Sequence, residues 1–76
     1  MSLPAISARQ AIRAFNKAGF AWVRQAGSHI LMQKHVKNST VTLVIPNHHE
    51  LAKGTLRAII RKAGMSVEDF VSLTRS

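Results

Sequence analysis

The stretch Ala26-Gly27-Ser28-His29 separates two apolar runs, residues 20–26 and 29–36, that have the composition of β-strands. Glycine can adopt backbone conformations that are closed to other residues, and serine is small, so this stretch predicts a tight turn between two strands. Such a turn places the histidine at the edge of a sheet instead of inside it. We therefore interpret the flanking segments as the framework that holds this imidazole.

Three strands are predicted in this framework. Aromatic and β-branched residues mark residues 20–26, alternating polarity marks 29–36, and residues 40–45 (TVTLVI) carry the clearest β signal. A hairpin turn is predicted at residues 37–39, and Pro46 ends the third strand because it lacks an amide hydrogen. Alternation gives the second strand two faces, with Ile30, Met32 and Val36 on one and His29, Leu31, Gln33 and His35 on the other.

A first helix is predicted between Ser7 and Gly19. Ser7 and Gln10 have the spacing of a capping box, and apolar residues then recur at helical intervals. Residues 1–6 are predicted to be a loose lead-in. Three basic residues, four positions apart, lie on another face of this helix: Arg9, Arg13 and Lys17.

Two further helices are predicted after the sheet. Thr55 is the expected N-cap of a helix over residues 55–63, and Ser66 predicts a short helix that ends near Leu73. Three basic residues form a ridge on the exposed side of the first of these helices: Lys53, Arg57 and Arg61. The order helix, three-stranded antiparallel sheet, helix and short C-terminal helix predicts an α+β two-layer sandwich, with one sheet face covered and the other open.

The charge of the chain predicts a polyanionic partner. Its 76 residues, expected to form one domain over residues 1–76, include 11 Lys and Arg against 3 Asp and Glu, a formal net charge of +8. Nucleic acid is the simplest partner, although an acidic protein or an anionic membrane surface would also match, and a solubilising surface is the plain alternative. The absence of cysteine excludes disulfides and thiolate chemistry. Without a spanning or signal segment, we expect a soluble, cytoplasmic protein.

An ordered set of motifs points to a known family. Between about Ile12 and Phe70 the chain carries, in sequence order, Gly19-Phe20, Gly27-Ser28-His29, a strand ending at Pro46, His48, Lys53-Gly54-Thr55-Leu56, Ile59-Ile60 and Ala63-Gly64. In this set the chain resembles the HicA toxins, small RNA-cleaving proteins of toxin–antitoxin pairs. One departure is the loop from Pro46 to Lys53, which is shorter than usual for the family and lacks a glycine.

The resemblance implies a fold like that of the double-stranded-RNA-binding domain and a type II toxin that cleaves mRNA. It also implies a HicB-like antitoxin partner that covers the active site, and it assigns the key histidine to His29. A non-catalytic RNA-binding module of the same fold is the alternative. A third interpretation is an interaction protein whose charge serves an acidic protein partner.

The residues fit RNA cleavage without a metal or other cofactor. RNA supplies its own nucleophile, the 2′-hydroxyl, and histidine suits the proton transfers because its ordinary pKa is near 6.5. Lys and Arg suit the stabilisation of the charged phosphorane, and no paired carboxylates indicate a two-metal nuclease. We predict that His29 is catalytic, against the simpler role of satisfying the turn, and that RNA is bound by Gly27, Ser28, His48, Lys53, Arg57 and Arg61.

The loop histidines and the tryptophan each have more than one possible role. His48 and His49 are candidates for a second catalytic group, phosphate contacts, metal ligands or plain loop residues. Trp22, the one tryptophan, would stack on a base if it is exposed, but a core or partner-interface role is favoured. His35 is expected to be solvated.

Overall fold

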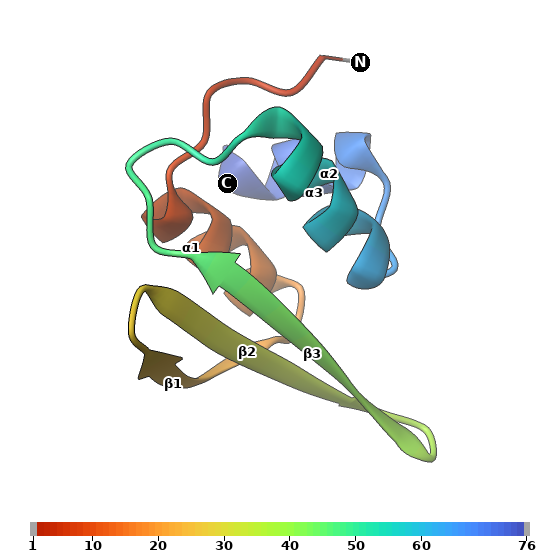
Figure 1. Cartoon of the computed structure of the whole chain (residues 1–76). Coiled ribbons are helices and arrows are strands. Elements are labelled where there is room, and N and C mark those ends of the chain that lie inside the picture. Colours follow the sequence, from red (N-terminus) through yellow and green to blue (C-terminus); the bar gives the residue numbers. More distant parts are fainter. Residues whose placement is uncertain (1, 76) are drawn as a thin grey trace.

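The computed structural model describes residues 2–75, so Met1 and Ser76, the ends of the predicted domain, lie outside the described residues. Figure 1 shows the helices gathered on one face of the sheet, while the far end of the β2–β3 hairpin extends beyond them. The predicted α+β order is confirmed by the six elements: α1 (Ala8–Lys17), β1 (Ala21–Ala26), β2 (His29–Val36), β3 (Ser39–Pro46), α2 (Lys53–Lys62) and α3 (Val67–Thr74).

The sheet is antiparallel in the order β1-β2-β3. The predicted alternation along β2 is confirmed, since Ile30 and Met32 are buried under the helices and His29 is exposed. Val36 lies on the same face of β2 as these buried residues, but its side chain is 41% exposed. It pairs with Ser39 at the tip of the hairpin, beyond the cover of the helices.

Three phenylalanines join the helices to the sheet. The Phe15 ring of α1 packs edge-on against Phe20, with centroids 6.0 Å apart, and lies 5.0 Å from the ring of Phe70 in α3. This packing makes one apolar core between the helical layer and the inner sheet face. The core residues, besides these three, are Leu3, Ile6, Ala8, Ala11, Ala14, Ile30, Met32, Leu43, Ile45, Leu51, Leu56, Ile59, Ile60 and Val71.

The N-terminal segment is part of the fold, so the prediction of a loose lead-in is wrong for its described residues. Leu3 and Ile6 are buried in the core. The Leu51 amide donates to the Ile6 carbonyl oxygen at 2.8 Å, which ties this segment to the loop before α2. Two isolated apolar residues have no periodicity, and for this reason the sequence pattern gave no sign of their burial.

Two of the three predicted helix caps are confirmed. The Gln10 amide donates to Ser7 Oγ at 3.1 Å and the Ser7 amide to Gln10 Oε1 at 2.9 Å, a complete capping box, while Ser66 Oγ accepts from the Asp69 amide at 3.0 Å. The prediction for Thr55 is wrong, because α2 begins at Lys53 after Ala52, without a side-chain cap. The helix thus begins two residues before Thr55, soon after the buried Leu51.

Candidate active site

The turn between β1 and β2 has two central residues, Gly27 and Ser28, between the paired residues Ala26 and His29. Gly27 has φ +59°, a value that glycine adopts without strain. The Gln25 side-chain amide donates to the Gly27 carbonyl oxygen at 3.0 Å. The Asn47 amide donates to the Ser28 carbonyl oxygen at 2.7 Å, so the turn is bound to the segment that leaves β3.

His29 lies on the face of the sheet that no helix covers. It pairs with Ala26 on one side and Pro46 on the other, and the next residue, Ile30, points into the core. The side chain is exposed. Within residues 2–75 its imidazole makes no hydrogen bond, whereas Nδ1 of His35 lies 3.2 Å from Thr40 Oγ1. His29 therefore presents a free ring to solvent at a backbone position that is fixed on both sides.

Arg24 shares the open face with His29, while a β-bulge at Val23 turns Trp22 to the other face. Trp22 pairs with Met32 and Arg24 with Leu31, so two residues of β1 advance for one of β2. In a regular strand, residues two apart share a face. The bulge places them on opposite faces, with Trp22 toward the helices and Arg24 on the open face. Because Arg24 is opposite the residue two positions after His29, it is a diagonal neighbour of the histidine.

Apolar residues lie beside this pair on the open face. Leu31 is half-buried, and its partner on β3, Val44, is 48% exposed. The side chains of both residues lie on the same face of the sheet as His29. The histidine and the arginine therefore stand at the end of an exposed surface that is partly apolar.

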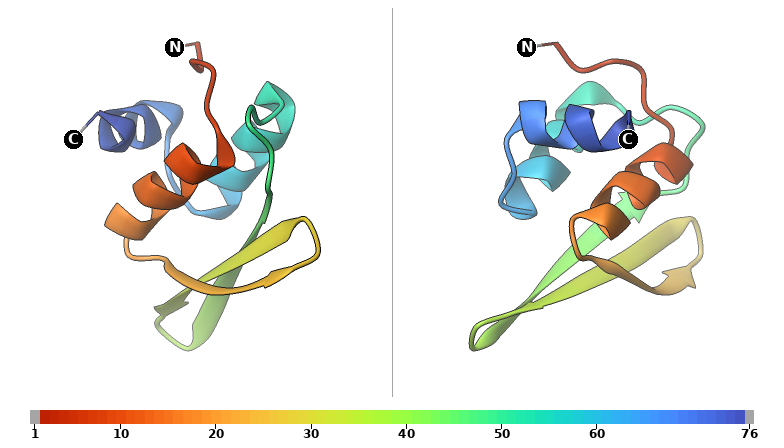
Figure 2. Two further views of the ribbon diagram at one scale, coloured as in Figure 1. Left: turned by 90° about the vertical axis from the view of Figure 1, so that its left-hand side faces the viewer. Right: turned by 180° about the vertical axis from the view of Figure 1, so that it is seen from behind.

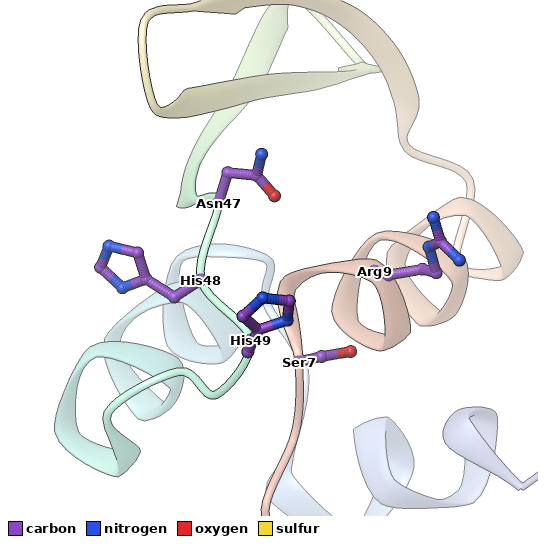
Figure 3. A pocket seen from close by; sticks show the side chains of 5 residues that line it. All are labelled: Ser7, Arg9, Asn47, His48 and His49. Atoms are coloured by element: carbon purple, nitrogen blue, oxygen red, sulfur yellow. The ribbon is translucent and has the colours of Figure 1, made fainter.

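A polar hollow lies next to the turn, between the start of α1 and the loop after β3. It has a volume of about 410 Å³ and is lined by Ser7, Arg9, Asn47, His48 and His49. Figure 3 shows the His49 ring beside Ser7 and the His48 ring pointing away from Arg9. The Ala8 amide donates to the His48 carbonyl oxygen at 3.0 Å, so this loop is fixed to α1. His29 is not one of the lining residues, and the hollow adjoins the turn through Asn47.

A comparison with protein families matches residues 8–65 to the HicA toxin of bacterial toxin–antitoxin systems. The chain belongs to the HicA toxin family. The matched segment runs from the start of α1 through the sheet and α2, and it includes the turn with His29. Membership supports a role as the toxin of a toxin–antitoxin system, with an antitoxin as partner. A comparison with curated proteins gives no significant match.

The basic ridge predicted for this HicA toxin lies apart from the turn. A groove between α2 and β3 is lined on the helix by Thr55, Ala58, Ile59 and Lys62. At 100° per residue, Arg57 and Arg61 lie on a different side of α2 from these residues. Figures 1 and 2 also place the start of α2, where Lys53 lies, away from the β1–β2 turn. The structure therefore groups Gly27, Ser28 and His29, with His48 nearby, but not the ridge.

Several HicA residues near the histidine were not predicted as site residues. Arg24 was not singled out, although a two-residue turn at Gly27 and Ser28 with alternation back from Ala26 puts it on the face of His29. Arg9 belongs to the basic row of α1, but only the hydrogen bond between Ala8 and His48 reveals that this row begins beside the loop histidines. Trp22 is 53% exposed, which rules out the core role.

Within residues 2–75, no three His, Cys, Asp or Glu side chains are grouped as a metal site would require. Among the helices of the same residues, none has the length and apolar character needed to cross a membrane.

Proposed function

We propose that this HicA-family toxin is a metal-independent endoribonuclease that cleaves mRNA, with His29 as its catalytic residue. The observation that carries the proposal is the position of Arg24 as a diagonal neighbour of His29 on the open sheet face. The turn fixes the histidine, and the regular pairing of Ala26 with His29 and of Arg24 with Leu31 puts the arginine on the same side. The arrangement thus offers a proton-transfer group and a permanent cation at one exposed position.

The proposed reaction is an internal displacement at phosphorus. The 2′-oxygen of a ribose attacks the adjacent phosphorus, a P–O2′ bond forms and the P–O5′ bond breaks. The 2′-hydroxyl loses its proton and the departing 5′-oxygen gains one, which gives a 2′,3′-cyclic phosphate and a 5′-hydroxyl. His29 carries one of these protons, and Arg24 stabilises the negative charge that accumulates on the phosphorane oxygens.

RNA binding is proposed for two surfaces. Near the turn, the small residues Gly27 and Ser28 let the RNA backbone approach, and His48 contacts a phosphate. On α2, a separate surface is formed by Lys53, Arg57 and Arg61, which contact the phosphate backbone farther from the histidine. The net charge of +8 supports both, because phosphate contacts dominate nucleic-acid affinity.

The antitoxin is proposed to be HicB-like and to inhibit the toxin by covering the open sheet face. Val44 and Leu31 give this face the exposed apolar character that protein partners bury. Its contact with His29 would be the cause of inhibition. A toxin that acts on mRNA in this way works in the cytoplasm.

A cleavage assay with matched arginine variants tests the proposal. Labelled single-stranded RNA is incubated with wild type, His29→Ala, Arg24→Gln and Arg57→Gln in the presence of EDTA. We expect a loss of roughly 10²–10⁴-fold for the histidine variant and about 10²-fold or more for Arg24→Gln. Arg57→Gln, with the same loss of charge, should retain most of its rate and show a salt dependence of binding flatter by about one unit of slope.

Two results would contradict the proposal. Cleavage by His29→Ala at the wild-type rate, with normal folding, would remove the histidine from the chemistry. RNA binding by wild type with no cleavage under any of these conditions would leave a non-catalytic RNA-binding module instead.

A further inference from the structure

The exposed Trp22 forms one wall of a second hollow, on the helix-covered side of the sheet edge. The hollow has a volume of about 350 Å³ and lies between β1 and the second half of α1. Its apolar floor includes Met32, the strand partner of Trp22. The remaining lining residues are Ile12, Arg13, Asn16 and Lys17, all from α1.

The residues of this hollow match the chemistry of an unpaired nucleotide. Trp22 offers a planar aromatic face that is 53% exposed, and Arg13 and Lys17 provide positive charge beside it. None of the lining residues is acidic. Single-stranded nucleic acids are bound by aromatic rings on which bases stack, beside cations that follow the phosphate backbone. In a duplex the base faces are already stacked on one another, and this mode of binding is closed to it.

The basic row of α1 connects this hollow to the polar hollow beside the turn. Arg9 lines the polar hollow, and Arg13 and Lys17 line the hollow of Trp22. Eight residues of α-helix separate the ends of this row, which is about 12 Å at 1.5 Å per residue. On β1 the distance from Trp22 to Ala26 is similar, about 13 Å at ~3.3 Å per residue. The row therefore extends from the hollow of Trp22 to the polar hollow, which adjoins the turn before His29 through Asn47.

We propose that Trp22 and the basic row of α1 bind single-stranded RNA, with one base stacked on the indole and adjacent phosphates at Arg13 and Arg9. The inference rests on the proposed ribonuclease function and specifies its substrate as unpaired RNA. The bulge at Val23 separates the two sites on β1. It turns Trp22 toward α1, whereas Arg24, on the turn side of the bulge, stays on the face of His29.

The tryptophan itself provides the measurement. Trp22 is the only tryptophan in the chain, which also lacks tyrosine, so its fluorescence reports this hollow alone. The His29→Ala protein is titrated with a single-stranded oligouridylate of about ten nucleotides and, separately, with an RNA duplex of the same length. We expect quenching by the single strand and little change with the duplex.

Variants then test the contacts by anisotropy of the labelled oligouridylate, all in the His29→Ala background. Trp22→Ala should weaken binding roughly 5- to 100-fold, whereas Trp22→Phe should retain most of the affinity because it preserves a stacking face. Arg13→Gln should flatten the salt dependence by about one unit of slope. Lys37→Gln, which removes the same charge at the tip of the β2–β3 hairpin, is the matched control for position.

The outcomes separate this inference from the ribonuclease proposal. Quenching by single-stranded RNA, with no cleavage by wild type, would support the binding site and refute the nuclease. Cleavage by wild type, with unchanged fluorescence and equal affinity of Trp22→Ala, would support the nuclease and overturn the inference. Absence of RNA binding by any form would refute both. If Trp22→Ala loses a co-expressed antitoxin but keeps its RNA affinity, the surface belongs to the protein partner and the inference is overturned.

Discussion

Two glycine-to-alanine substitutions should change the free energy of unfolding in opposite directions. A Cβ added at Gly27 or at Gly54 would meet no atom within 4 Å, so neither substitution causes a clash. The difference between the sites is conformational. Gly27 in the turn before His29 has φ +59°, while Gly54 lies in the first turn of α2, outside the set of positive-φ residues.

The expected magnitudes follow from this difference. An L-residue in the left-handed region costs about 1–2 kcal/mol, and alanine offsets about 0.4–1 kcal/mol of this by restricting the unfolded chain. Gly27→Ala should therefore lower stability by about 1 kcal/mol. Gly54→Ala carries no such strain and should raise stability by about 0.4–1 kcal/mol.

Urea unfolding followed by circular dichroism measures both effects. With a slope of about 1 kcal/mol per molar urea for so small a protein, the midpoint should fall by about 1 M for Gly27→Ala and rise by up to about 1 M for Gly54→Ala. The slope itself should stay the same, since the buried surface does not change. A Gly27→Ala midpoint at or above that of wild type would refute the conformational reasoning, as would a Gly54→Ala midpoint below it.

The remaining predictions concern stability and use the same unfolding measurement. Ser7→Ala removes a complete capping box and should cost about 1 kcal/mol, whereas Thr55→Ala, which alters no cap, should stay within about 0.5 kcal/mol; equal losses would contradict the assignment of the caps. Phe70→Ala removes a fully buried ring that packs on Phe15 and should cost about 3–5 kcal/mol, so a loss below 1 kcal/mol would contradict its place in the core. Lys34→Ala should lower the free energy of unfolding by about 1 kcal/mol, because Lys34 Nζ donates to the Ala18 carbonyl oxygen at 3.0 Å and lies 5.6 Å from the centroid of the Phe20 ring. An unchanged midpoint would show that water replaces both contacts.

Local chemistry made much of the fold predictable. The Gly-Ser turn, the caps at Ser7 and Ser66 and the strand over residues 29–36 each depend on a few neighbouring residues, and the structure has all of them. The early start of α2 at Lys53 was missed because its N-cap, Ala52, makes no side-chain hydrogen bond, so no local signal marks it. The burial of the N-terminal segment was missed because it too leaves no local signal.

The candidate site was only half predictable. His29 stood out because a glycine turn precedes it. Arg24 was missed, although the two-residue turn and regular alternation back from Ala26 put it on the face of His29. The face that Trp22 occupies could not be predicted, because it depends on a one-residue bulge at Val23 that leaves no pattern in the sequence. The ridge on α2 is a regular feature of the sequence, and the structure places it on a different surface from the turn.

The most direct test of the account is to map the ends of the RNA products. Wild type and His29→Ala are incubated with single-stranded RNA in EDTA, together with a substrate that carries a 2′-deoxy sugar at the mapped cleavage position. We expect 2′,3′-cyclic phosphate and 5′-hydroxyl ends from wild type alone, and no cleavage at the deoxy position. Cleavage of the deoxy substrate, or equal cleavage by His29→Ala, would contradict this expectation.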